Sequence, residues 1–598
     1  MRQHILATAL AAAVTALAYG QNLNPTVEVT NAYEGGASAI AKPAQQMAVP
    51  DSVTRFNLDF DYSVFEKPYQ GAYEFSPYYV QLKPAPKAST TEKFYLRAGA
   101  GFTLHPELDL VWTPVQKENY RMSVYATHQS YFGRYHDFAL GTPVDGVTPV
   151  VKSGEKMKGY LADTKAGIDG VYNWDGGLVF LDLGFRNRMA DDAYHYQKIS
   201  GLEAKARVRS LPSGEPHFLY DAAVDYSFLG GDVSDFASLS KDFRESKFAL
   251  TGEFGPVLDA DRRLLVGLNV DLARYLDGYS YSGYTGRMAV TPKYQFNLDN
   301  WRFSLGAQLS WLVYSDDFNL WPEQYRHKSG FIYPDVHVDF SLLDDQLILQ
   351  ASATGGDRFN TLSGRFFSHP FSWEGQFGHS VERIRAMIGA RGNIAARFRY
   401  DLQGGYARWT YAPVESLANY TFQVVEHPNG TLSGSGSLSD ESSIVTSMTV
   451  LRPALAEKGF NLFFVDFDYG WKSESVTVDG KLSYRHANIT EDAAFGPAAF
   501  TGFIRPAYNY GERMKGGLDI AWSTGRKATA TSSLESGTLT TTYRIPGWVD
   551  LGVFAEYRFT HRFGFWAKGG NLLNQVVQKI PLVAEAGAYF TAGIVLNF

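Results

Sequence analysis

The sequence predicts an all-β fold, a transmembrane antiparallel β-barrel of about 22 strands (range roughly 16–22) behind a short N-terminal periplasmic segment. Three observations favour this fold. Segments of alternating apolar and polar residues recur from Lys93 onward, tight turns alternate with longer polar connections, and the last strand ends on Phe598. No apolar run of ~18 residues follows the N-terminus, which excludes a helical membrane protein.

The N-terminal residues have the features of a signal peptide. Arg2 supplies a positive charge, Ile5–Leu17 form a short apolar core, and the small residues Ala18 and Gly20 flank the expected cleavage site. The chain is therefore divided into three parts: 1–20, a signal peptide; 21–92, an N-terminal periplasmic or luminal segment; and 93–598, the transmembrane barrel.

The alternating segments are long for a soluble protein. Val179–Arg188, Leu264–Tyr275, Trp301–Tyr314 and Val549–Thr560 each place apolar side chains on one face and polar or small side chains on the other. They last about 10 to 14 residues, whereas soluble strands have ~5–6 and a tilted strand needs ~9–11 to cross a bilayer. These lengths favour a membrane barrel over a soluble sandwich.

Connections of two lengths alternate along the chain. The tight turns are Gln116–Glu118, Asp175–Gly176, Pro212–Gly214, Asp259–Asp261, Leu298–Asn300, Asp344–Asp345, Ala395–Ala396, Ser473–Glu474, Asn509–Gly511 and His561–Arg562. The long polar stretches include Arg134–Glu155, Asp316–Lys328, Gly355–Phe377, Ala412–Lys458 and Thr524–Thr542. Short periplasmic turns and long outer loops are expected of bacterial barrels, and this register puts both termini in the periplasm. The strands that contain Pro114 and Pro506 are the least regular.

Composition agrees with this fold and excludes several functions. Aromatic residues make up 15% of the chain and it has 57 glycines, while its mean hydropathy is only −0.21. An apolar exterior and a polar lumen together give such an average. The chain has no cysteine, which excludes disulfides, thiolate metal sites and a lipidated N-terminus. The net charge of −7 argues against nucleic-acid binding.

The C-terminal strand resembles the signal that the outer-membrane assembly machinery reads. Its outward face carries Phe590, Ile594, Leu596 and Phe598, and the chain stops on the aromatic ring. This machinery is therefore an expected partner, together with outer-membrane lipid. Five tryptophans near strand ends are expected to anchor the barrel at the headgroup level: Trp301, Trp311, Trp471, Trp548 and Trp566.

Charged residues on the polar faces of strands are candidates for lining the lumen. They are Asp182, Arg186, Arg188, Asp335, His337, Asp339, Asp466, Asp468, Glu556 and Arg558. They could tune passage of a solute, or form salt bridges that simply pack the wall. The triplet at 335, 337 and 339 could also bind a polar ligand, but its ~6–7 Å spacing is too long for a shared metal. We predict no metal site and no cofactor.

The C-terminal part of the chain resembles TonB-dependent receptors. Trp566–Gln575 is similar to the Asn-Leu-Phe-Asn-like hairpin before their last strand, and the expected strand number is theirs. More specifically, Asn24–Gly35 and Ala48–Phe65 resemble the N-terminal segments of receptor-like barrels of Bacteroidota. The resemblance implies an outer-membrane barrel with a plug of ~150 residues before it. Residues 21–92 are too few for that plug.

The same resemblance implies a candidate TonB box at Thr26, Val27, Glu28, Val29 and Thr30. Alternating β-branched residues near a mobile terminus can add a strand to a partner, here the TonB protein. A chance match, or docking of this segment within the protein itself, is the alternative.

Three functions remain open, and none is enzymatic. The first is a TonB-dependent-receptor-like barrel that takes up or passes a solute. The second is a non-transporting scaffold in a multiprotein outer-membrane complex, with a surface lipoprotein or other envelope subunits as partners. The third is a passive porin. The sequence contains no nucleophile elbow, Walker loop or His-Glu-x-x-His motif.

Overall fold

The computed structural model describes the chain from Lys93 to the C-terminus with short gaps. The described residues are 93–102, 104–192, 196–210, 217–234, 241–276, 283–315, 330–343, 346–368, 379–395, 397–426, 432–435, 443–456, 459–490, 494–511, 513–534 and 537–598. The expected signal peptide, N-terminal segment and TonB box therefore lie outside the described residues, as does the expected loop Asp316–Lys328.

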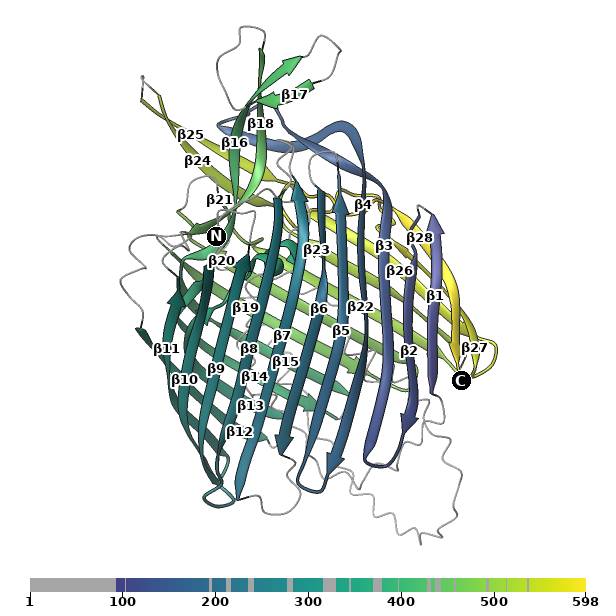
Figure 1. Cartoon of the computed structure of the whole chain (residues 1–598), viewed down its shortest axis with the longest axis vertical. Helices are drawn as coiled ribbons and strands as arrows, with labels where there is room; N and C mark the ends of the chain where they lie inside the picture. Colours follow the sequence, from purple (N-terminus) through teal and green to yellow (C-terminus); the bar gives the residue numbers. More distant parts are fainter. Residues whose placement is uncertain are drawn as a thin grey trace, which may run out of the picture. The chain divides into compact units, whose positions relative to one another are not determined.

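The described chain forms a closed antiparallel barrel of 22 strands, as predicted (Figure 1). Its strands are β1 (Phe94–Phe102), β2 (Glu107–Gln116), β3 (Tyr120–Leu140), β4 (Val147–Trp174), β5 (Gly177–Asp191), β6 (Tyr196–Ser210), β7 (Phe218–Ser234), β8 (Lys241–Pro256), β9 (Arg262–Leu276), β10 (Gly283–Leu298), β11 (Trp301–Tyr314), β12 (Gly330–Leu343), β13 (Leu347–Arg358), β14 (Ser380–Ile394), β15 (Phe398–Thr410), β19 (Phe460–Lys472), β20 (Val476–Ala487), β22 (Phe500–Tyr510), β23 (Met514–Ser523), β26 (Trp548–Arg558), β27 (Phe563–Gly570) and β28 (Tyr589–Asn597).

The barrel closes where the last strand pairs with the first. β28 runs antiparallel to β1 in a register from Tyr95 opposite Asn597 to Phe102 opposite Phe590. The backbone N–H of Phe94 donates to the carbonyl of Phe598 at 2.8 Å, which extends this seam to the last residue. Since β1 also pairs with β2 and β28 with β27, neither strand is left with a free edge.

Side chains alternate between the two faces of the wall as the sequence predicts. On β11, Trp301, Leu305 and Trp311 are 43–44% exposed, whereas Ser304 and Ser310 are almost completely buried. The same alternation holds on β5, where Leu181 and Leu183 are more than half exposed. The outer face is therefore a continuous apolar surface and the inner face is polar, which is the pattern of a barrel in lipid.

The predicted tight turns that the structure fully describes fall between consecutive strands of the barrel and lie at one end of it (Figure 1), whereas Pro212–Gly214, Asp344–Asp345 and Ala396 lie outside the described residues. Longer connections join the strands at the other end. The two proline-containing strands are accommodated by the sheet. The β2–β3 register shifts between Trp112 and Val115, around Pro114, while Pro506 sits opposite Val478 on β20. A bulge beside proline relieves the missing backbone donor.

Three of the stretches expected to be outer loops are instead β-structure. Arg134–Glu155 is largely an extension of the β3–β4 hairpin, Ala412–Lys458 carries β16 (Ala412–Glu426), β17 (Leu432–Ser435) and β18 (Ser443–Ala456), and Thr524–Thr542 carries the hairpin of β24 (Arg526–Leu534) and β25 (Gly537–Ile545). Strand β25 pairs in parallel with the start of β4, and β21 (Ala494–Phe495) pairs with β16. Threonine-rich segments such as β24 and β25 favour strands despite their polarity.

Two of the five expected tryptophan anchors are wrong. Trp566 is only 3% exposed and lies on the inner face beneath the Arg97 guanidinium, 3.7 Å from its ring centroid. Trp548 donates its ring N–H to the carbonyl of Gln578 at 3.1 Å. Both follow from strand parity, because their neighbours Phe565 and Val549 point outward.

Among the described residues, no helix has both the length and the apolar character needed to cross a membrane.

Candidate functional site

The inner wall of the barrel is lined with charged side chains that pair across neighbouring strands. Arg97 on β1 lies 3.5 Å from Asp109 on β2, Arg287 on β10 lies 2.8 Å from Asp271 on β9, and Arg505 on β22 lies 3.0 Å from Asp519 on β23. Neighbouring strands thus present opposite charges at the same height. Every candidate residue predicted to line the lumen lies on this inner face.

The first group of these candidates lies on β5. Asp182 accepts a hydrogen bond of 2.6 Å from the hydroxyl of Tyr125, and Arg186 lies 3.1 Å from Asp163 on β4. Arg188 is only 7% exposed, and it donates to the backbone carbonyl of Phe367, a residue far away in sequence. Arg188 therefore fixes another segment of the chain against the wall.

The candidate triplet on β12 does not converge on one point. Asp335 accepts from Nε2 of His337 at 3.0 Å and lies 3.3 Å from Lys293, whereas Asp339 pairs with Arg391 at 2.9 Å. In the part of the chain that the structure describes, no group of three or more His, Asp or Glu side chains is arranged to hold a metal. The triplet is part of the paired wall.

The remaining candidates are paired in the same way. Asp466 lies 2.9 Å from Arg485 and accepts from the hydroxyl of Ser483 at 2.7 Å. Asp468 lies 3.6 Å from Lys481. Glu556 and Arg558 pair with one another at 2.9 Å. These candidate residues are therefore paired within the wall.

The connection between β13 and β14 folds into the lumen, which the sequence did not predict. It contains a short helix, α3 (Leu362–Ser368). The hydroxyl of Thr361 accepts a hydrogen bond of 3.1 Å from the N–H of Gly364, so Thr361 caps the helix. Leu362 and Phe366, one helical turn apart, are 1% and 0% exposed.

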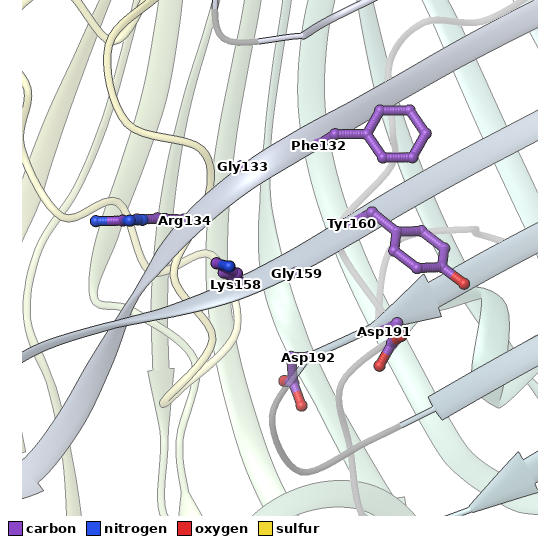
Figure 2. Close-up of a pocket in the computed structure, with 8 residues that line it drawn as sticks. All are labelled: Phe132, Gly133, Arg134, Lys158, Gly159, Tyr160, Asp191 and Asp192. Atoms are coloured by element: carbon purple, nitrogen blue, oxygen red, sulfur yellow. The ribbon is translucent and has the colours of Figure 1, made fainter.

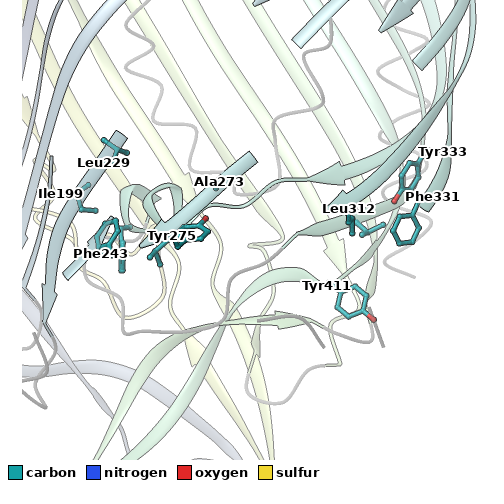
Figure 3. Packing of buried hydrophobic residues seen from close by; sticks show 12 residues of the cluster. Ile199, Leu229, Phe243, Ala273, Tyr275, Leu312, Phe331, Tyr333 and Tyr411 are labelled. Carbon is teal, nitrogen blue, oxygen red and sulfur yellow. The ribbon is translucent and has the colours of Figure 1, made fainter. Parts of the chain in front are cut away.

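The apolar face of α3 packs on the inward-facing side chains of several strands (Figure 3). Figure 3 shows Phe243 and Tyr275 close to the helix, with Ile199 and Leu229 on the adjoining strands. The whole cluster comprises Ile199, Leu229, Phe243, Ala273, Tyr275, Leu312, Phe331, Tyr333, Leu362, Phe366, Val381 and Tyr411. Since these residues belong to the inner face of the barrel, the helix occupies part of the lumen.

Polar groups of the wall hold the same segment. Glu245 on β8 is fully buried, and its carboxylate accepts from both the backbone N–H and the hydroxyl of Ser363. Arg287 donates to the backbone carbonyl of Asp357, and the hydroxyl of Tyr333 donates to the Asp357 carboxylate at 2.6 Å. Buried polar groups with these partners are costly to separate, so residues 357–368 are held firmly against the inner wall. We call these residues the luminal segment.

The connection between β27 and β28 is also ordered against the wall. The Asn571 side-chain amide donates to the carbonyls of Gln575 and Ala586, which closes this connection on itself. Val577 and Ala584 within it are 1% and 5% exposed. It packs against residues of β3, β4 and the β24–β25 hairpin. This is the Asn-Leu-Leu-Asn stretch on which the family resemblance rests.

The proposed assembly signal lies on the outer face of β28. Phe590 and Phe598 are each 54% exposed, whereas Thr591 and Val595 between them are buried on the inner face. The ring of Phe598 lies 6.2 Å from that of Phe94 on β1. The Phe598 ring is therefore exposed on the outer face at the seam.

The comparisons with known proteins bear on the fold. No protein-family model and no curated protein matches the sequence. Among solved structures, the FrpB iron transporter from Neisseria meningitidis (F3-3 variant) matches with a TM-score of 0.59 and 11% identity, over 85% of this chain and 81% of that one. The siderophore receptor PirA from Acinetobacter baumannii gives 0.57 and 10% identity over 85% and 80%, and the copper transporter OprC gives 0.56 and 12% identity over 85% and 80%. The chain thus has the fold of outer-membrane receptor barrels.

Proposed function

We propose that this protein is an outer-membrane barrel that takes up a solute through its lumen, in the manner of TonB-dependent receptors. The observation that carries the proposal is the closed barrel with an apolar exterior, a charge-paired inner wall and a luminal segment hydrogen-bonded across the bore. The similarity of the barrel to iron, siderophore and copper transporters supports it. Ferric siderophores and copper are therefore the first solutes to assay.

Energy coupling is assigned to Thr26–Thr30, which would pair as an added strand with TonB. The test is capture of the mature protein by the periplasmic domain of TonB. The Val29→Pro variant removes a backbone donor in the middle of the added strand, so it should abolish capture. Val53→Pro, elsewhere in the same N-terminal segment, is the matched control and should bind normally. If the wild-type protein is not captured, energised uptake is wrong.

We place the tight turns and both termini on the periplasmic side. The absence of native cysteine makes the test simple, because a single introduced cysteine reports on its own site. Intact cells treated with a membrane-impermeant maleimide should label Ser532→Cys in the β24–β25 hairpin and leave Glu118→Cys in the β2–β3 turn unlabelled. The reverse pattern would invert the orientation.

A scaffold function is the second candidate. The joined β-structure at the end of the barrel with long connections favours it, because β25 pairs with β4 and β21 with β16 to give an ordered platform. A surface lipoprotein or other envelope subunits that copurify stoichiometrically from detergent-solubilised outer membranes, with no solute uptake, would support it. Large constant currents from the wild-type protein in planar bilayers would instead establish a passive porin.

A further inference from the structure

A groove on the outer face of β3, β4 and β5 lies where the barrel wall ends. Its volume is about 500 Å³, and its lining includes Phe132, Arg134, Lys158, Tyr160, Asp191 and Asp192. Figure 2 shows the rings of Phe132 and Tyr160 extending together from adjacent strands, with Arg134 and Lys158 farther along the same pair and both aspartates at the end of the next strand. The groove therefore combines an apolar floor with charged groups.

The aromatic pair marks the edge of the apolar belt. Phe132 and Tyr160 are cross-strand partners whose rings stack with centroids 5.6 Å apart. On the same face of β4, Tyr172 stacks on Trp174 near the opposite end of the barrel. At ~3.3 Å per residue, Tyr160 and Tyr172 are about 40 Å apart along the strand. A strand tilt of ~35–45° reduces this to about 30 Å across the membrane, the thickness of a bilayer core.

Beyond Tyr160 the hairpin of β3 and β4 continues past the ends of β2 and β5. β5 ends at Asp191, opposite Tyr160, and the β2–β3 pairing begins at Glu107, opposite Gln129. Farther out, the start of β4 pairs with β25. The outer face of this extended hairpin carries cross-strand pairs of cations. Arg134 lies opposite Lys158, and His136 lies opposite Lys156.

These cations differ from those of the lumen in having no carboxylate partner. The inner-wall arginines described above each lie within 4.0 Å of a carboxylate or donate to a backbone carbonyl. Among the described residues, no carboxylate lies within that distance of Arg134, Lys156 or Lys158. Partial burial, followed by the charges of Lys152 and Lys156, lowers the pKa of His136.

We propose that this groove binds the phosphorylated headgroup of an outer-leaflet glycolipid, with the phosphate on Arg134 and Lys158 and the acyl chains over Phe132 and Tyr160. Cations just beyond an aromatic belt are placed at the depth of lipid phosphates. The carboxylate of Asp191 lies near the ring of Tyr160, where it can accept hydrogen bonds from sugar hydroxyls. Phosphate, hydroxyl groups and acyl chains occur together in such a glycolipid. The assignment rests on the proposed orientation, in which this end of the barrel faces the outer leaflet.

The test uses the full mature protein, purified from outer membranes in detergent and titrated with bis-phosphorylated lipid A under native mass spectrometry. The wild-type protein should bind it. The double variant Arg134→Ala with Lys158→Ala should bind it roughly tenfold more weakly or worse, because each substitution removes one attraction between a cation and the phosphate. Arg134→Lys with Lys158→Arg should retain binding. Dephosphorylated lipid A and phosphatidylglycerol should both bind the wild-type protein more weakly.

Arg262→Ala is the matched control, since Arg262 is a cation at the tight-turn end that lies 2.5 Å from Asp259. It should leave lipid A binding unchanged. Equal binding by the doubly substituted protein, by dephosphorylated lipid A or by phosphatidylglycerol would overturn the proposal. An equal loss in Arg262→Ala would do so as well. Solute uptake by the same variants separates this result from the proposed function, because the groove lies outside the lumen and uptake should persist.

Discussion

Glu245, on the inner face of β8, accepts a hydrogen bond of 2.9 Å from the backbone N–H of Ser363 in α3. The two residues are 118 positions apart in the sequence, and both are buried. The contact ties the luminal segment to the wall at the start of its helix, where the backbone donors have no partner within the helix. Part of the lumen is therefore occupied by the chain's own helix, which a small number of identifiable contacts hold against the wall.

Substitution of Glu245 should loosen the luminal segment. Glu245→Ala leaves the Ser363 donors without a buried partner, which costs about 1–3 kcal/mol of docking free energy. In planar bilayers the single-channel conductance should rise, or the channel should open more often, relative to the wild-type protein. Glu203→Ala is the control, because Glu203 pairs with Lys165 at 3.8 Å, on the same wall and away from α3. Equal conductance in all three proteins would show that the segment does not limit passage.

The closing seam should be sensitive to a side chain at Gly593. A Cβ atom there would lie 1.9 Å from the carbonyl oxygen of Ala98 on β1, and this backbone atom cannot move without breaking the pairing. Gly593→Val should destabilise the folded barrel by about 1–3 kcal/mol. In gel electrophoresis the folded barrel and the unfolded chain migrate differently. The variant should convert to the unfolded mobility at a lower temperature than the wild-type protein. Gly170→Ala, whose nearest backbone neighbour is 3.7 Å away, should behave as wild type.

The terminal aromatic should matter for assembly in the cell more than for stability. Phe598→Ala keeps the backbone carbonyl that accepts from Phe94 but removes the exposed ring. We expect less protein in the outer membrane and normal unfolding of the fraction that assembles. Phe565→Ala removes a similarly exposed ring from the neighbouring strand and should assemble normally. Comparable losses in both variants would mean that any exposed aromatic of this region serves, and the proposed signal would be wrong.

Lipid A binding should strengthen as the pH falls below the ordinary histidine value of 6.5. The pKa of His136 is lowered by burial and by Lys152 and Lys156, so without lipid the ring stays neutral into this range while the unfolded chain takes up the proton. The contribution of His136 to the stability of the folded state is therefore present above pH 6.5 and is lost as the pH falls below 6.5. A bound phosphate opposes the lysines and favours the protonated ring. His136→Gln should flatten the pH dependence of lipid A binding, and His561→Gln at the tight-turn end should not.

The barrel could be predicted from the sequence because the two-residue period of a strand fixes which side chains meet lipid. Leu181 and Leu183 point outward and Asp182 inward for that reason alone. The tryptophan predictions failed at Trp548 and Trp566 because they followed residue type and position near strand ends and ignored parity. Because Val549 belongs to the outward apolar face of its strand, the adjacent Trp548 must point inward, which would have corrected the prediction for Trp548.

The inward course of the luminal segment was not visible in the sequence. Gly355–Phe377 has the length and polarity of an outer loop, and these two properties do not distinguish a loop that returns into the lumen. One signal was present in the sequence, because Leu362 and Phe366 are spaced one helical turn apart. Two large apolar side chains in a loop outside the membrane need another part of the protein to bury them. Their partners come from distant strands, so only the closed barrel shows what buries them.

Leu181, Leu183 and Phe185 on β5 meet acyl chains, while Asp182 and Gly184 between them face the lumen. Single cysteines placed in turn at Leu181, Asp182, Leu183, Gly184 and Phe185 can carry a nitroxide spin label in the otherwise cysteine-free protein in lipid nanodiscs. Collision with apolar oxygen should be high at 181, 183 and 185 and low at 182 and 184. A profile with no two-residue period, or with all five labels open to a water-soluble relaxation agent, would contradict this placement of the side chains.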